Sequence, residues 1–305
     1  MKSTFFAGNR IFSICILIIL MSFITSCTPG GNGPTPPPPA WETLINLPGY
    51  CSFSDFTPSG QSVLYAGSGV GSFNQYEFPT GANAQGVLSS LTSPASIQDY
   101  IGFAWSGSYL YFAMGSTVYK YNISGDSWTT PVTGLTYSHG SAETTADDSG
   151  YIYSTSGSNY LLKYNTADDS FTYYGTPGGL THEEPRAAWD PSTSRVYLAD
   201  YEHTPFYAFN PADNSFTALT AFPDSYGMSD AFCSDRHGHI YTANADSSST
   251  ATDVWVYTEA TDSWSQFSPS LPFSHGDSAA CSISDDGYLY FTNGSTNQFA
   301  RIKIF

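Results

Sequence analysis

Hydrophobic and polar positions alternate in short runs along most of the chain, and residues typical of turns separate the runs. One pair, an aliphatic residue followed by tyrosine, recurs about every 42 to 49 residues, within the repeat lengths of propeller blades. The six copies are Leu64-Tyr65, Leu110-Tyr111, Ile152-Tyr153, Val196-Tyr197, Ile240-Tyr241 and Leu289-Tyr290. This repeat predicts an all-β, six-bladed β-propeller in which each pair marks the second strand of one blade.

The repeat unit is clearest between residues 139 and 174. A partly apolar run at 141–146 is followed by a turn at 147–150 and a short strand at 151–153. A further strand at 161–164, a turn at 165–170 and an outer strand at 171–174 complete the unit. Four short strands joined by tight turns predict one antiparallel blade.

The turn into the predicted fourth strand also repeats, with two aromatic residues seven positions apart. The pairs are Tyr121 and Trp128, Tyr164 and Phe171, Phe209 and Phe216, and Tyr257 and Trp264. We expect the second aromatic ring to pack between neighbouring blades. The Asp or Asn two residues before it should hydrogen-bond the backbone of the turn.

This tyrosine, turn and tryptophan pattern resembles the kelch family of propellers over nearly all of residues 41–305. The family's paired glycines after the second strand are absent, however, and pairs such as Ala199-Asp200 and Ala243-Asn244 stand in their place. The last repeat, from 288 to 305, has no room for a fourth strand, whereas residues 41–48 resemble the fourth-strand stretch 264–272. We therefore expect the N-terminal strand to complete the sixth blade, which removes exposed sheet edges.

The N-terminal segment predicts a lipid-anchored, secreted protein. Lys2 and Arg10 precede or flank an apolar run at 11–24, which is typical of a signal peptide over 1–26. The residues up to Cys27 resemble a bacterial lipobox, which implies lipidation of Cys27. Residues 27–40 are rich in proline and glycine and predict a tether, followed by a propeller over 41–305. We expect a location in the bacterial cell envelope, at the outer membrane, with membrane contact through the anchor only.

Composition excludes some partners of the mature chain. Seven basic residues remain after the signal, against 26 acidic ones, so the net charge is near −19. This charge excludes nucleic acid, whose phosphates need a basic surface. Three cysteines remain beyond Cys27, namely Cys51, Cys233 and Cys281, and no CxxC spacing occurs among them. We expect buried structural thiols, with a disulfide as the alternative, and the sequence does not choose a pair.

Residues at the mouth of the predicted channel are the candidates for function. Aligned repeats place Tyr50, His139, His182, Tyr226 and His275 where the chain enters successive blades, with Gln98 as the less certain member. Around these positions lie Glu143, Glu183, Glu184, Arg186, Asp230 and Asp277. The expected ligand-binding set is Tyr50, His139, His182, Glu184, Arg186, Tyr226, Asp230, His275 and Asp277.

Several roles for the three histidines remain open. As acid or base catalysts, His139, His182 or His275 would act with Glu143 or Glu183 near neutral pH. As structural residues, the two Ser-His-Gly segments would hydrogen-bond a neighbouring blade and carry no chemistry. Because no metal-binding motif is present, we expect no metal and no cofactor.

Arg186 is a candidate for holding a carboxylate, such as that of a uronic or sialic acid, or for an ion pair with Glu183 or Glu184. Together these patterns predict a monomeric envelope propeller that binds a glycan or a protein at the channel mouth. A carbohydrate-active enzyme of the lyase or sugar-epimerase type is one alternative, and an assembly scaffold is another.

Overall fold

The structure is a computed structural model. It describes residues 38–47, 51–53, 56–57, 63–68, 72–79, 85–93, 102–129, 132–139, 143–156, 159–178, 180, 185–245, 251–276, 279–294 and 296–305. The chain divides into two units, Met1–Pro38 and Pro39–Phe305, and the described strands belong to the second. The predicted signal and Cys27 lie outside the described residues, as does the tether up to residue 37. Within the described part, no helix combines the length and the apolar character of a membrane span.

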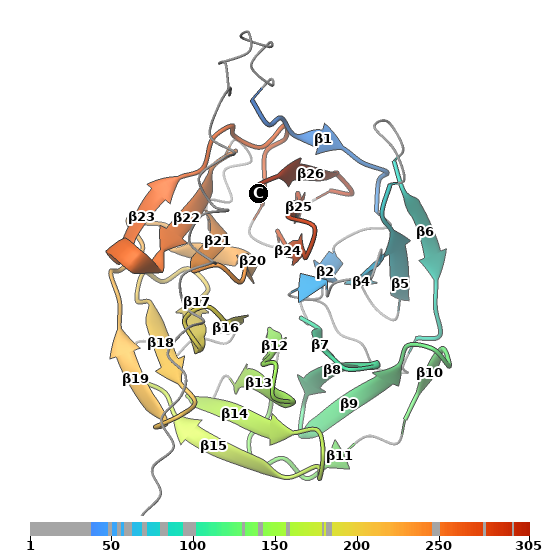
Figure 1. Cartoon of the computed structure of the whole chain (residues 1–305), viewed down its shortest axis with the longest axis vertical. Coiled ribbons are helices and arrows are strands. Elements are labelled where there is room, and N and C mark those ends of the chain that lie inside the picture. Colours follow the sequence, from blue (N-terminus) through green and yellow to red (C-terminus); the bar gives the residue numbers. More distant parts are fainter. Residues whose placement is uncertain are drawn as a thin grey trace, which may run out of the picture. The chain divides into compact units, whose positions relative to one another are not determined.

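The described strands gather into six sheets that are arranged in a ring (Figure 1). Each sheet contains a path of four antiparallel strands that runs from the centre of the ring to its rim. The prediction of an all-β propeller with four antiparallel strands per blade is therefore confirmed. We number the sheets 1 to 6 in the order in which the chain enters their innermost strands.

Sheets 1, 3, 4 and 5 contain four strands each. Sheet 1 comprises β2 (Cys51–Phe53), β4 (Val63–Ser68), β5 (Ser72–Glu77) and β6 (Val87–Ser90). Sheet 3 comprises β12 (Thr144–Ala146), β13 (Tyr151–Ser156), β14 (Tyr160–Asn165) and β15 (Phe171–Gly175). Sheet 4 comprises β16 (Pro185–Asp190), β17 (Arg195–Asp200), β18 (Tyr207–Asn210) and β19 (Ser215–Ala218). Sheet 5 comprises β20 (Met228–Ser234), β21 (His239–Asn244), β22 (Val254–Thr258) and β23 (Ser263–Gln266), with the 3-10 turn η1 (Glu259–Thr261) between the last two.

Sheets 2 and 6 each carry one additional strand. Sheet 2 comprises β7 (Ala104–Ser106), β8 (Tyr109–Met114), β9 (Thr117–Asn122) and β10 (Ser127–Trp128), and β11 (Val132–Thr133) also pairs with β9. Sheet 6 comprises β24 (Cys281–Ser284), β25 (Tyr288–Thr292), β26 (Phe299–Lys303) and β1 (Glu42–Thr43), and β3 (Phe56–Thr57) pairs with β24 in parallel. In sheet 6 the N-terminal strand β1 thus lies beside the C-terminal strand β26, with Glu42 opposite Arg301.

The recurring aliphatic-tyrosine pair has a direct structural explanation. Successive side chains of a strand point to opposite faces, so the two residues of one pair pack against different neighbouring sheets. Ile152 belongs to the apolar cluster between sheets 2 and 3, whereas Tyr153 belongs to the cluster between sheets 3 and 4. In the next sheet, Val196 belongs to the cluster between sheets 3 and 4, and Tyr197 belongs to the cluster between sheets 4 and 5. The repeat therefore marks the second strands and also contributes to the packing on both sides of a sheet.

The aromatic residues of the fourth strands lie between neighbouring sheets, as predicted. The indole N–H of Trp128 donates to the carbonyl of Thr92 at 2.8 Å, and that of Trp264 donates to Thr220 at 2.9 Å. Trp41 donates to the carbonyl of Pro269 at 2.8 Å in the same manner. The expected role of the Asp two residues before the ring was wrong. Asp262 accepts hydrogen bonds from the hydroxyl of Tyr257 and the backbone N–H of Thr220, both at 2.8 Å, rather than from its own turn.

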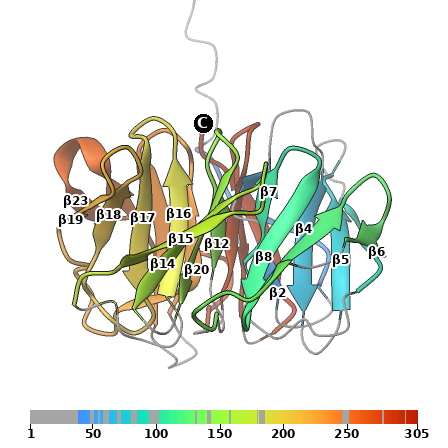
Figure 2. The same cartoon turned by 90° about the horizontal axis from the view of Figure 1, so that it is seen from below.

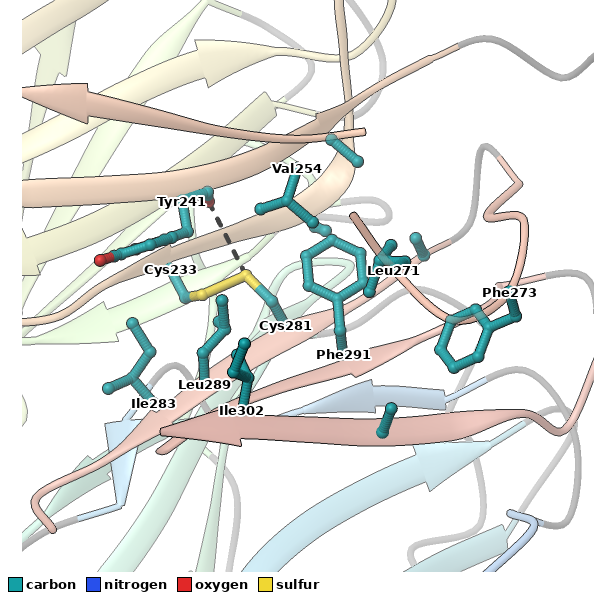
Figure 3. Close-up of a cluster of buried hydrophobic side chains, with 14 residues drawn as sticks. Cys233, Tyr241, Val254, Leu271, Phe273, Cys281, Ile283, Leu289, Phe291 and Ile302 are labelled. Atoms are coloured by element: carbon teal, nitrogen blue, oxygen red, sulfur yellow. Dashed lines mark hydrogen bonds between the residues drawn. A yellow bond between two sulfur atoms is a disulfide. The ribbon is translucent and has the colours of Figure 1, made fainter. Parts of the chain in front are cut away.

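Two of the three cysteines that follow Cys27 form a disulfide. Cys233 in β20 is bonded to Cys281 in β24, and their Cα atoms are 5.9 Å apart. The bond lies within the apolar cluster between sheets 5 and 6, beside Tyr241, Leu289 and Phe291 (Figure 3). The expectation of unpaired structural thiols is thus corrected for these two residues. The bond links the innermost strands of two consecutive sheets.

Candidate functional site

The candidate residues lie on the face of the ring at which the chain enters the innermost strands. On this face Pro185, the first residue of β16, pairs with Asp200, the last residue of β17, and Met228 pairs with Asn244 likewise (Figure 2). We call it the connector face. His139, Arg186, Tyr226, Asp230 and His275 are described there. Tyr50, Gln98, His182, Glu183, Glu184 and Asp277 lie outside the described residues.

His139 links the connector before β12 to the sheets on either side. Its backbone N–H and carbonyl exchange hydrogen bonds with Gly115 of sheet 2, at 2.8 and 2.7 Å. Its ring is buried, with Nδ1 2.9 Å from the carbonyl of Thr155 and Nε2 3.3 Å from the hydroxyl of Tyr173. Because a carbonyl only accepts, Nδ1 carries the proton and Nε2 accepts from Tyr173. The residue therefore joins sheet 2 to sheet 3.

The protonation of His139 follows from its surroundings. Burial disfavours the charged imidazolium and lowers the pKa of His139 to about 4, against a small opposing effect of the Thr155 carbonyl. At neutral pH the ring is therefore uncharged, and both of its nitrogens have partners within the fold. A general base has to reach a proton of the substrate, and this ring does not present a nitrogen for that purpose.

His275 occupies the corresponding connector between sheets 5 and 6. Its backbone N–H donates to the carbonyl of Ala251 at 2.8 Å, and the next residue, Gly276, donates to the carbonyl of Asn293 at 2.7 Å. The side-chain amide of Asn293 donates in turn to the carbonyl of Ser274. The ring of His275 is also buried. His139 and His275 thus both lie in connectors that bond to the sheets before and after them, through the ring of His139 in one case and the backbone of Gly276 in the other.

Asparagines hold the connectors where the kelch pattern has paired glycines. Asn293 contacts Ser274 of the incoming connector, and the amide of Asn244 donates to Asp224 at 3.0 Å in the preceding one. Both asparagines are buried at the ends of their second strands. This departure of the sequence from the family pattern therefore corresponds to polar side chains that bind the connector leading into their own sheet.

Arg186 and Asp230, two predicted ligand-binding residues, bind one another. Arg186 in β16 is 1% exposed and forms an ion pair with Asp230 in β20. The geometry suits the carboxylate-binding role that the sequence suggested, but the carboxylate comes from the neighbouring sheet of the same chain. The sequence indicated Glu183 or Glu184 as ion-pair partners of Arg186, and both of these lie outside the described residues. The guanidinium thus joins sheet 4 to sheet 5.

Glu143, a candidate partner of a catalytic histidine, is half-buried one residue before β12. Its backbone lies close to Gly102, where an added Cβ would be 2.9 Å from the Cα of Glu143. The close approach places Glu143 at the contact between sheets 2 and 3. No group of three or more potential metal ligands occurs in the described ranges.

Tyr226 differs from the other described candidates because its side chain is 55% exposed. It lies in the connector before β20, in a turn in which Asp224 accepts a hydrogen bond from its backbone N–H at 3.0 Å. Next to this turn lie Glu202 and His203, which sequence reasoning missed. Their approach explains why position 227 is glycine, because its φ of +78° and the neighbouring backbone exclude a side chain.

The seven basic residues that follow residue 26 are all described, and nearly all of them have contacts within the fold. The six with direct partners are Lys120 over Tyr109, Lys163 over Tyr151, Arg186 with Asp230, Arg236 with Asp148, Arg301 with Glu42, and Lys303 with the carbonyl of Asp286. The seventh, Arg195, is the first residue of β17, and its backbone lies opposite that of Asp190 at the far end of β16. Only Arg186 lies at the connector face, and it is buried. The described part of this face therefore carries no accessible lysine or arginine.

Comparisons with known proteins identify the fold. No protein-family profile and no curated protein matches the sequence. A crystal structure of the RRP9 WD40 repeats is similar, with a TM-score of 0.58 at 10% identity, over 87% of this chain and 97% of that one. A structure of U3-55K has the same TM-score at 9% identity, over 87% and 98% of the two chains. At such identities the likeness indicates a β-propeller and does not choose among its many functions.

Proposed function

We propose that this chain is a lipid-anchored protein of the bacterial cell envelope, and that its propeller binds a glycan or protein ligand at the connector face without catalysis. The observation that carries the binding proposal is a contrast on this face. His139 is buried and uncharged, with both ring nitrogens bonded within the fold, whereas Tyr226 exposes an aromatic side chain. Exposed aromatic residues on a fixed backbone are typical of binding sites.

We also infer a six-bladed ring of kelch-like type in which β1 supplies the fourth strand of the last blade. Two observations support this inference. β1 pairs with β26, the third strand of sheet 6. The indole of Trp41 contacts Pro269 of the preceding sheet, in the way that Trp128 contacts Thr92. Trp41, Trp128 and Trp264 thus make the same type of hydrogen bond, from the indole N–H to a backbone carbonyl beside the preceding sheet.

The anchor is supported by the sequence, through the signal-like segment 1–26, Cys27 and the proline-rich segment that follows. A lipid-anchored chain incorporates labelled palmitate in bacteria and fractionates with membranes. Cys27→Ser should abolish both the label and the membrane association. Cys51→Ser is the matched control and should change neither. Retention of the label in Cys27→Ser would contradict the assignment of the anchor.

The binding proposal is tested with the full chain on an array of glycans and of envelope protein extracts, alongside an assay for released reducing sugar. We expect binding without turnover, and weaker binding by Tyr226→Leu. Phe305→Leu is the matched control, since this side chain is 49% exposed and lies at the C-terminal end, away from the connector face. Release of sugar that His275→Gln abolishes would instead support the enzymatic alternative. Binding that ignores Tyr226 would contradict the assignment of the site.

A further inference from the structure

The side chain of Tyr226 is one of the few large apolar side chains that are exposed. In the described part, the exposed large apolar residues are Val87, Tyr226 and Phe305. Of these, Tyr226 is the one that lies at the connector face, between sheets 4 and 5. A single exposed ring is ordinary on a protein surface. Its meaning therefore depends on how it is held and on what surrounds it.

The backbone that carries Tyr226 is fixed from both neighbouring sheets. One oxygen of Asp224 accepts from the Tyr226 backbone N–H, and the other accepts from the Asn244 side chain of sheet 5, both at 3.0 Å. Gly227 has a φ of +78°, and an added Cβ would lie 2.2 Å from the carbonyl carbon of Glu202 in the turn after β17. Only glycine fits this close approach. A ring on such a turn loses little backbone freedom when it binds a ligand.

The groups beside Tyr226 are acidic. Glu202 is exposed, and its backbone N–H donates to the carbonyl of Met228 at 3.0 Å, which fixes it next to the Tyr226 turn. Asp224 contributes a second carboxylate on the same turn. The one arginine or lysine of the connector face, Arg186, is buried against Asp230. An aromatic ring with carboxylates nearby and no accessible cation favours a positively charged group over an anionic one.

We propose that Tyr226, Glu202 and Asp224 form the docking site for a lysine or arginine side chain of a partner protein. The cation lies over the ring of Tyr226 and pairs with Glu202, and the net charge of the chain attracts such a partner over longer distances. This inference rests on the proposed function, and it selects a basic protein segment over a glycan as the ligand. A neutral glycan stacked on Tyr226 is an outcome that the experiment below separates.

The test measures the fluorescence anisotropy of a labelled Gly-Arg-Gly-Arg-Gly peptide with the full chain at physiological salt. Tyr226→Leu keeps the charge and removes the ring, and should raise the Kd about two- to fivefold. Glu202→Gln keeps the shape and removes one charge, and should raise the Kd by a similar factor. Glu77→Gln and Phe305→Leu make the same types of change elsewhere and should leave the Kd unchanged. The peptide with Gln in place of Arg should not bind.

Four results would overturn the proposal. If Glu77→Gln weakens binding as much as Glu202→Gln does, the peptide binds through the net charge of the chain and not at the proposed site. If Tyr226→Leu binds the peptide as the unsubstituted chain does, the ring has no part in binding. If neutral oligosaccharides bind in a Tyr226-dependent way and the peptide does not, the ligand class is wrong while the proposed function stands. If neither probe binds and no extract protein is retained, both proposals fail.

Discussion

Strand β20 contacts its two neighbouring sheets in different ways. Toward sheet 4, Asp230 pairs with Arg186, and the hydroxyl of Ser234 donates to Asp190 at 2.9 Å. Toward sheet 6, Cys233 is bonded to Cys281 within an apolar cluster (Figure 3). Because side chains alternate along a strand, one short segment makes polar pairs on one face, beside the apolar cluster that contains Met228 and Phe232, and a disulfide within an apolar cluster on the other. We call these two contacts the polar junction and the covalent junction.

The two junctions fix the relative position of their sheets by different kinds of bond. Apolar packing is not directional, so the junction between β20 and β24 relies on the disulfide for a fixed pairing. The polar junction uses directional bonds instead. The buried carboxylate of Asp190 accepts from Ser192, Thr193, Ser234 and the backbone N–H of Gly238, and thereby spans sheets 4 and 5. Each junction should respond to a different perturbation.

The largest effect is expected from Arg186→Ala, which breaks the polar junction on one side only. The substitution leaves the carboxylate of Asp230 buried without its guanidinium, and removing one partner of a buried ion pair costs about 3–5 kcal/mol. The free energy of unfolding, measured by urea denaturation, should fall by that amount. A loss below about 1 kcal/mol would show that water reaches Asp230.

A double variant separates the charge from the packing at the same place. Arg186→Met with Asp230→Leu replaces both charges by apolar groups of similar length, and such replacements are often neutral or stabilising. We expect it to recover most of the stability that Arg186→Ala loses. If the double variant is as unstable as the single one, the pair contributes through shape rather than through charge.

The covalent junction should give the next largest effect. The disulfide closes a sequence separation of 48 residues, and its loss in Cys233→Ala with Cys281→Ala should lower the free energy of unfolding by about 2–4 kcal/mol. Dithiothreitol should destabilise the unsubstituted chain by a similar amount and leave the double variant unchanged. Arg186→Ala should remain sensitive to the reductant, because the two junctions lie on opposite faces of β20. Equal melting temperatures with and without reductant would contradict this prediction.

The sequence was sufficient to predict a β-propeller because the aliphatic-tyrosine pattern is periodic and local. An aliphatic residue and a tyrosine on opposite faces of a strand are needed in every blade, so the pair recurs wherever a second strand forms. The disulfide was not predictable, since Cys233 and Cys281 lie 48 residues apart and nothing local distinguishes either from Cys51. The partner of Arg186 was missed for the same reason. Asp230 is 44 residues away and becomes its neighbour only when sheets 4 and 5 are side by side.

The candidate site was predicted in position more than in chemistry. Aligning the repeats placed His139 and Tyr226 at one position of the repeat, and in the structure both lie in connectors that lead into innermost strands. The alignment did not indicate that His139 would turn toward Thr155 or that Tyr226 would be exposed. Burial of a side chain depends on what the neighbouring sheet supplies. The catalytic candidates His182 and Glu183 stay predictions, because they lie outside the described residues.

The smallest effect concerns a third junction, between sheets 2 and 3, where His139 forms polar contacts without charge. Its pKa is lowered from an ordinary value near 6.5 to about 4, so the unfolded chain takes up a proton at a higher pH than the folded one does. Its contribution to stability is complete above about pH 6.5 and is lost progressively toward pH 4. Between pH 7 and pH 5 the loss amounts to about 2 kcal/mol.

His139→Gln removes this titration, so its free energy of unfolding should fall about 2 kcal/mol less between pH 7 and pH 5 than that of the unsubstituted chain. His239 provides the opposite sign, because its hydrogen bond with Asp235 raises the pKa of that histidine. Its contribution is present below the pKa of the unfolded chain and is lost as the pH rises through the folded value. His239→Gln should therefore make the chain more sensitive to acid over the same interval. Parallel pH profiles for all three proteins would mean that neither histidine titrates differently in the fold, and the uncharged junction would then not depend on burial of the ring.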